Sequence, residues 1–220
     1  MPAASYLQGL SWYGHSSFKV ARGGVTLYLD PWRLPVEPHD ADLVLITHPH
    51  FDHLDPGDVA KVVKSDTVIV TVADCAAKLQ EAKVPGTIQI VKPGDVVKVK
   101  GAVIEVVPAY NTNKPAHPKE KQWVGFIVEI DGVRIYHAGD TDFIPEMRGF
   151  KNLDVALLPI SGTYTMTVEE AVEAAQALSP KVVVPMHYGQ IIGTAEDAKR
   201  FQKLCNGMLV EILPREKGKK

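Results

Sequence analysis

The chain has 220 residues, an apolar content of 45% and a formal net charge of −2. This length suits a single domain over residues 1–220, and the small net charge excludes the overall basic field that gathers nucleic acid or an anionic membrane. The sequence contains neither a secretory signal pattern nor an apolar run of about 18 residues. We therefore expect a cytoplasmic protein that binds neither nucleic acid nor a membrane.

The two cysteines, Cys75 and Cys205, are far apart and have no cysteine neighbours. This spacing argues against a thiolate zinc site and against a disulfide framework. Both fall in segments with helical patterns, so we expect them to be buried or half-buried thiols that fill space.

The first half of the chain predicts several short strands and two helices. Apolar, β-rich runs predict strands at 26–29, 43–47, 67–72, 96–99 and 103–107. Asp55 followed by Pro56 predicts a helix to about Lys64, and Asp74 opens another to about Lys83.

The second half predicts a hairpin and two capped helices. Asp131-Gly132 separates runs 125–130 and 133–137, which is typical of a hairpin with a type I′ turn. Thr167 with Glu170 forms a capping box for a helix that stops before Pro180. Thr194 opens the last helix, which ends by Gly207.

The two halves, about 1–100 and 101–220, follow a similar order of elements. Phe18 and Val25–Tyr28 correspond to Phe126 and Val133–Tyr136, and each hairpin is followed by a buried strand, a helix and another buried strand. This order predicts two β-rich halves packed sheet on sheet, with helices outside.

A cluster of polar residues follows the predicted strand that ends at Thr47. Four potential metal ligands occur within six residues: His48, His50, Asp52 and His53. Imidazole and carboxylate without thiolate suit a borderline divalent ion, and Pro49 forbids a helix through the loop. The spacing lets His48 and His50 chelate one ion, while Asp52 and His53 point to a neighbouring ion.

The pattern His48-x-His50-x-Asp52-His53 resembles the signature of the metallo-β-lactamase superfamily. Gly139-Asp140-Thr141 is similar to that family's bridging aspartate motif, and His187 in Pro-Met-His-Tyr is similar to its last histidine ligand. Gly14-His15-Ser-Ser-Phe18 and Thr165-Met166 resemble the branch that includes ascorbate-6-phosphate lactonase-like proteins and N-acylphosphatidylethanolamine phospholipase D. The resemblance implies an α/β (α+β) fold, the four-layered αβ/βα sandwich.

The resemblance also implies a centre of two divalent ions, for which we expect Zn²⁺, with Mn²⁺ or Fe²⁺ as alternatives. Carried over residue by residue, His48 and His50 bind the first ion. Asp52, His53 and His187 bind the second ion, and Asp140 bridges both.

The third histidine for the first ion departs from the family pattern. In the family it follows a strand that ends in Pro-Ala, but here Pro108-Ala109-Tyr110 leads to Asn111. His117 is the nearest imidazole, and a six-residue loop can swing it into place. We expect His117 to complete the site, with Asn111 or water as the alternative.

Other residues carry weaker signals. Asp30 either accepts a hydrogen bond from a ligand histidine or only begins a turn before Pro31. His137 is expected to be a satisfied core histidine rather than a ligand. His15 either lines the cleft or has a structural role at a strand end. Tyr164 and Tyr188 are expected to pack, with a hydrogen bond to a substrate oxyanion as the alternative.

The resemblance implies a hydrolase in which a metal-bound hydroxide attacks a lactone, another ester or a phosphodiester of a small molecule. Asp52, besides binding metal, would orient the hydroxide and accept its proton, and the sequence has no Gly-x-Ser-x-Gly motif for a serine nucleophile. Two alternatives stay open. One is a di-iron redox enzyme on the same fold, although such relatives carry Glu in place of His50. The other is a non-catalytic metal-binding protein.

Overall fold

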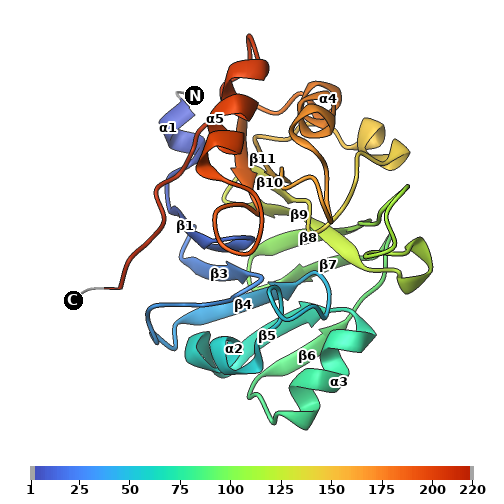
Figure 1. The fold of residues 1–220 in the computed structure, drawn as a ribbon. Coiled ribbons are helices and arrows are strands. Elements are labelled where there is room, and N and C mark those ends of the chain that lie inside the picture. Colours follow the sequence, from blue (N-terminus) through green and yellow to red (C-terminus); the bar gives the residue numbers. More distant parts are fainter. Residues whose placement is uncertain (1–2, 219–220) are drawn as a thin grey trace.

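The computed structural model of the protein describes residues 3–218. Two mixed six-stranded sheets pack face to face, with helices α2 and α3 outside the first sheet and α4 and α5 outside the second (Figure 1). The expected four-layered αβ/βα sandwich is therefore confirmed.

The first sheet contains six strands in chain order: β1 (Leu10–Gly14), β2 (Ser17–Arg22), β3 (Val25–Leu29), β4 (Ala41–Ile46), β5 (Val63–Thr71) and β6 (Thr87–Ile90). The second sheet has the order β12-β11-β10-β9-β8-β7: β7 (Val96–Val99), β8 (Ala102–Pro108), β9 (Val124–Ile130), β10 (Val133–His137), β11 (Val155–Pro159) and β12 (Val182–Met186). The helices are α1 (Ala3–Tyr6), α2 (Pro56–Val62), α3 (Ala73–Glu81), α4 (Val168–Leu178) and α5 (Ala195–Leu204), with 3₁₀ turns at Lys119–Lys121 and Pro145–Gly149.

The two sheets share one pattern of connections. β2 and β3 pair antiparallel, and β3, β4 and β5 then run parallel, with α2 between β4 and β5. β9 and β10 likewise pair antiparallel, and β10, β11 and β12 run parallel, with α4 between β11 and β12. The repeat order read from the sequence matches this topology. That residues 1–220 form a single domain stays a prediction.

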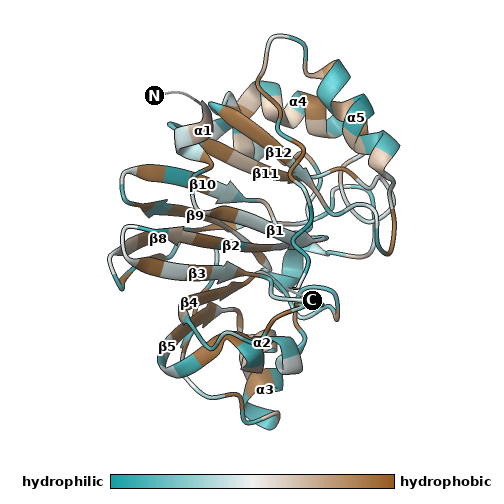
Figure 2. Cartoon of the chain, turned by 90° about the vertical axis from the view of Figure 1, so that its left-hand side faces the viewer, coloured by the Kyte–Doolittle hydropathy of each residue, from teal (hydrophilic) through white to brown (hydrophobic). Residues whose placement is uncertain are grey.

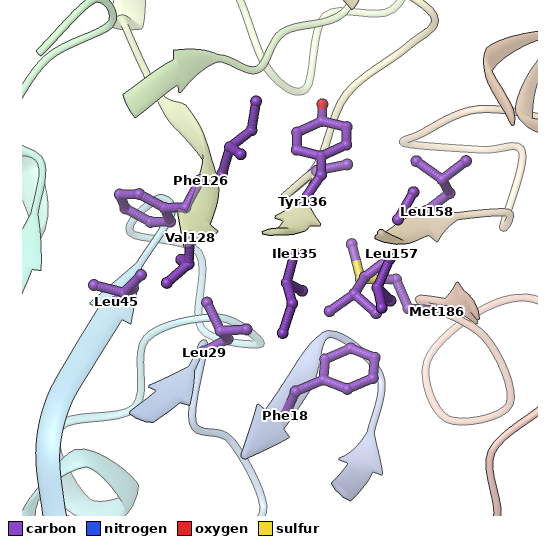
Figure 3. Packing of buried hydrophobic residues seen from close by; sticks show 14 of the residues in the cluster. Phe18, Leu29, Leu45, Phe126, Val128, Ile135, Tyr136, Leu157, Leu158 and Met186 are labelled. Atoms are coloured by element: carbon purple, nitrogen blue, oxygen red, sulfur yellow. The ribbon is translucent and has the colours of Figure 1, made fainter. Parts of the chain in front are cut away.

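The core lies between the sheets. Phe18 and Leu29 of the first sheet point toward Val128 and Ile135 of the second (Figure 3), and each is at most 2% exposed. Burial of such a side chain stabilises the fold by about 1.5–3 kcal/mol. Figure 2 shows apolar residues concentrated in the strands and hydrophilic residues on the outer helices, such as α5.

Local signals explain the turns and caps. Asp131 and Gly132 both have positive φ, 49° and 68°, as the predicted type I′ turn requires. The capping box of Thr167 and Glu170 is formed, and Thr194 forms a second one with Asp197. These predictions are confirmed.

Several predicted boundaries are wrong. α2 ends at Val62 instead of near Lys64, because β5 begins at once with Val63. α3 begins one residue before Asp74 and ends at Glu81 rather than near Lys83. Cys205 lies one residue beyond α5 rather than within a helix, although it is buried. The edge strand β6 escaped prediction because most of its residues are exposed, which leaves no apolar run to mark it.

None of the helices in residues 3–218 is long and apolar enough to cross a membrane. The predicted cytoplasmic location stays a prediction.

The buried thiols allow a first test of the packing. Burial raises the pKa of Cys75 to about 12 and that of Cys205 to about 11. Because the thiolate is the reactive form, we expect neither thiol of the native protein to react with a disulfide reagent such as DTNB at pH 8. Both should react once guanidinium unfolds the chain. Rapid labelling of the native protein, followed by absorbance, would contradict this packing.

Candidate metal centre

The loops at one edge of the sandwich bring together polar residues from both halves. His48 follows β4, Asp140 follows β10, and His187 follows β12. Within each sheet, parallel pairing brings the carboxyl ends of neighbouring strands to one edge. The two edges adjoin, since Asp140 Oδ2 lies 3.9 Å from His48 Nε2 and 3.1 Å from His187 Nε2. Histidines and aspartates far apart in the sequence therefore share one cluster.

Three imidazoles form a first group, which we call group 1: His48, His50 and His117. His50 Nδ1 lies 3.1 Å from His48 Nε2 and 3.2 Å from His117 Nε2. Three ring nitrogens that converge so closely repel one another unless a proton or cation lies between them. Group 1 therefore has the donor set and the geometry to hold a divalent ion.

A second set of ligand atoms, which we call group 2, comes from both halves: Asp52, His53, His187 and His15. His187 Nε2 lies 3.9 Å from Asp52 Oδ2. His53 Nε2 and His187 Nε2 are buried and have no hydrogen-bond partner among the described residues. Because buried polar atoms are nearly always satisfied, these bare nitrogens fit a site that takes a metal ion.

The Asp140 carboxylate lies between the two groups. Its Oδ2 is 3.2 Å from His117 Nε2 in group 1 and 3.1 Å from His187 Nε2 in group 2. Its Oδ1 is 3.1 Å from His53 Nε2, and it too has no hydrogen bond within residues 3–218. One carboxylate thus faces both sets of imidazoles.

Asp30 fixes the orientation of two histidines in the cluster. Its Oδ2 accepts a 2.6 Å hydrogen bond from His53 Nδ1 and a 2.7 Å hydrogen bond from the Thr47 hydroxyl. Since that hydroxyl donates to Asp30, it can accept from His48 Nδ1, 2.9 Å away. In the neutral form of each ring these bonds keep the proton on Nδ1, so that Nε2 is the atom free to bind a metal ion. The contact with a ligand histidine is the first of the two roles considered for Asp30.

The structure brings His117, not Asn111, into group 1. Asn111 Oδ1 accepts hydrogen bonds from His117 N at 3.0 Å and His117 Nδ1 at 2.9 Å. The Asn111 amide nitrogen donates to Asp142 at 3.1 Å and to the Tyr164 carbonyl at 2.9 Å, which fixes the amide orientation. Asn111 therefore holds the His117 ring with Nε2 free, so the residue at the expected histidine position supports the imidazole that takes its place.

Sequence reasoning left the place of His15 open and passed over Ser161. His15 is fully buried, and its Nε2 lies 2.9 Å from Asp52 Oδ2. Its carbonyl accepts from the backbone N–H of His187, which ties the two loops together. Ser161 Oγ lies 3.0 Å from His187 Nδ1. These contacts join residues far apart in the chain, so they leave almost no local signal in the sequence. The one available hint was the position of His15 at a strand end.

The other candidates lie outside the cluster or at its edge. His137 Nε2 donates to the Ser16 carbonyl, and its Nδ1 accepts from Gly139, as expected for a satisfied core histidine. Tyr188 is buried against Trp12, with ring centroids 5.1 Å apart. Tyr164 lines the pocket above the cluster and is half-exposed.

Burial and neighbouring charges shift the pKa values of the cluster residues in opposite directions. Burial lowers the pKa of His48, whereas for His53 the carboxylates of Asp140 and Asp30 outweigh burial and raise the pKa well above its usual value. Burial raises the pKa of Asp52, but the His15 hydrogen bond outweighs it and brings the pKa to about 2. Burial is likewise outweighed at Asp140, where His187 and His53 hold the pKa well below its usual value. Both carboxylates are therefore ionised at neutral pH, as binding of a cation requires.

Comparisons with known proteins agree with this arrangement. Residues 9–187 match the family described as "Beta-lactamase superfamily domain". The chain is 37% identical over 204 residues to a protein of Pyrococcus abyssi named UPF0173 metal-dependent hydrolase, covering 87% of this chain and 89% of that protein.

Solved structures are similar over nearly the whole chain. A crystal structure from Parabacteroides distasonis has a TM-score of 0.78 and 35% identity, covering 92% of this chain and 91% of that one. Igni18, described as a metallo hydrolase from Ignicoccus hospitalis, has a TM-score of 0.78 and 29% identity, covering 94% of each chain.

The contact between Asn111 and His117 can be tested by metal binding. We expect Asn111→Ala to lower the affinity for the weaker-bound Zn²⁺ by about 10–100-fold, because His117 loses the partner that fixes its ring. Calorimetric titration of the demetallated protein measures this affinity. Asn113→Ala, an exposed change two residues away, is the matched control. Equal affinities in all three proteins would show that Asn111 does not position His117.

Proposed function

The chain belongs to the metallo-β-lactamase superfamily, and we propose that it is a metal-dependent hydrolase built on two divalent ions, with Zn²⁺ as the preferred metal. The observation that carries the proposal is the Asp140 carboxylate, which faces bare ring nitrogens on both sides. Such a donor set of imidazole and carboxylate suits Zn²⁺, Mn²⁺ and Fe²⁺ alike. The closer resemblance to the ascorbate-6-phosphate lactonase-like branch stays a prediction.

In this proposal each group holds one ion. His48, His50 and His117 of group 1 bind the first, and Asp52, His53 and His187 of group 2 bind the second. Asp140 binds both. Asp30, Asn111 and Ser161 hold the rings in place through the hydrogen bonds described above.

The ions would supply Lewis acidity, which polarises the electrophilic oxygen of a substrate and makes water a stronger acid. The chain supplies position and proton transfer. Asp52 lines the pocket, and one of its oxygens is held by His15. That contact fixes the Asp52 carboxylate at the second ion site, where it would also orient the attacking water and accept its proton, so Asp52 is the proposed catalytic residue.

A small-molecule substrate is supported by the size of the pocket. The cavity above the cluster measures about 320 Å³, and Asp52, Asp140 and His187 are in its wall. A lactone, another carboxylic ester and a phosphodiester are the reaction types considered, because each is cleaved by attack of water on a polarised carbonyl or phosphoryl group. An open pocket beside the ligand atoms favours catalysis over a closed structural site.

The proposal predicts that His48→Ala removes both metal and activity. The affinity for at least one ion should fall by more than the roughly 10–100-fold expected from loss of an outer partner, because a ligand atom is removed. Chelation of the wild-type protein should abolish hydrolysis of model esters and phosphodiesters, and added Zn²⁺ should restore it. Elemental analysis and a substrate panel measure these effects.

His39→Ala is the matched control, because His39 is an exposed histidine outside the cluster. This variant should keep the metal content and turnover of the wild type. Full activity in demetallated protein would contradict the mechanism. Metal binding without turnover of any substrate would favour a non-catalytic protein, and an iron-oxo absorption band would favour the redox alternative.

A further inference from the structure

Three large apolar side chains stand exposed around the pocket that contains the cluster. Phe51 is 67% exposed, Tyr164 46% and Ile191 42%. All three line the same pocket as Asp140 and His187. We call Phe51, Tyr164 and Ile191 the apolar rim. A group of exposed apolar residues around a cavity is typical of a binding surface.

The apolar rim is assembled from three separate loops. Phe51 lies between β4 and α2, Tyr164 between β11 and α4, and Ile191 between β12 and α5. Residues 3–218 contain four other exposed large apolar side chains, and all of them lie outside this pocket: Ile90, Val96, Leu204 and Leu209. The three rim side chains therefore expose apolar surface to water at one pocket and do not contribute to the core.

Local contacts hold the three rim residues in place. The Phe51 ring meets the edge of buried Trp32, with ring centroids 6.2 Å apart. The Tyr164 carbonyl accepts a hydrogen bond from Asn111. The loop that carries Ile191 is closed by a hydrogen bond from Gly189 N to the Gly193 carbonyl. The Phe51 ring is therefore held by a ring contact, and the backbone that carries Tyr164 and Ile191 is held by hydrogen bonds.

The pocket offers no cationic side chain to an anionic substrate. Beside the apolar rim its described lining consists of Ala116 and five histidines and aspartates of the cluster, with neither lysine nor arginine. Lys114, near Asn111, is paired with Asp142 at 2.6 Å. Arg33 stacks on Trp32, 4.4 Å from the ring centroid, and is not part of the pocket lining. A charged group held at the rim would lose water without gaining a partner.

We propose that the substrate is an uncharged carboxylic ester or lactone whose apolar acyl chain packs against the apolar rim. The inference rests on the proposed function and narrows its substrate class. An aliphatic chain gains free energy by covering Phe51 and Ile191, whereas a sugar phosphate or a nucleotide has polar or anionic groups at the same place. The rim residues are thus specificity determinants of the proposed reaction.

The reaction balances with water as the only co-reactant. Water oxygen forms a bond to the carbonyl carbon, and the bond from that carbon to the ester oxygen breaks. One water proton goes to the departing alcohol oxygen, and the other leaves the new carboxylic acid, which ionises at neutral pH. A lactone gives a single hydroxy acid.

The test compares three substrates of the Zn²⁺-loaded protein: p-nitrophenyl octanoate, p-nitrophenyl acetate and bis(p-nitrophenyl) phosphate. We expect kcat/KM for the octanoate to exceed that for the acetate by at least about tenfold. This is the lower end of the effect of a single methylene group in an apolar pocket, and the octanoate chain is longer than the acetate by several. The phosphodiester should be the slowest of the three. Phe51→Ser and Ile191→Ser should each lower the octanoate-to-acetate ratio by about fivefold or more.

Leu204→Ser is the matched control, because Leu204 is as exposed as Ile191, 42%, and lies on α5 outside the pocket. It should keep the wild-type ratio. As a readout without turnover, 1-octanol should bind the wild type more tightly than Phe51→Ser in calorimetric titration.

The outcomes separate this inference from the proposed function. Ester hydrolysis without chain-length preference, or with a ratio that neither rim variant changes, would overturn the role of the apolar rim and leave the hydrolase intact. Faster cleavage of the phosphodiester would overturn the substrate class alone. If the metal-loaded protein hydrolysed none of the three substrates, both proposals would fall.

Discussion

The Asp140 carboxylate, buried among imidazoles from both halves of the chain, is the constraint on which the site depends. A buried charge is costly unless it is paired, yet Asp140 Oδ1 has no hydrogen bond from the described residues, and the nearest ring nitrogens are bare. Positive charge between these atoms would offset the desolvation cost of the carboxylate and the repulsion between the ring nitrogens. In the proposed centre two metal ions would supply that charge, whereas protons on the rings would block the ligand atoms.

The sandwich places these atoms without help from the cluster itself. β10 and β12 both pair parallel with β11 and so end at one edge of the second sheet, and β4 ends at the adjoining edge of the first. The packed faces of the sheets fix the distance between them. The backbone N–H of Val124 donates to the Thr47 carbonyl, which joins the sheets next to His48. The core therefore sets how ligand atoms from the two halves meet within each group before a ligand binds.

The sequence predicts the parts of the site that are close in the chain. Three histidines and an aspartate within six residues needed only spacing and residue type, whereas Asp140 and His187 were identified through the resemblance to a known family. His117 was preferred to Asn111 only as the nearest imidazole, because the choice depends on how one loop folds. His15, Ser161 and Asp142 act through contacts with residues distant in sequence, and such contacts leave no local pattern. For the same reason the hairpin turn was predicted well, while the junction of α2 with β5 was not.

The most direct measurement of the central claim is electron paramagnetic resonance of demetallated protein titrated with Mn²⁺. A carboxylate shared by two ions predicts uptake of two Mn²⁺ per chain and a spectrum of an exchange-coupled pair, and Asp140→Asn should lose the coupling. One uncoupled ion per chain, or two ions whose spectrum Asp140→Asn leaves unchanged, would contradict a centre bridged by Asp140.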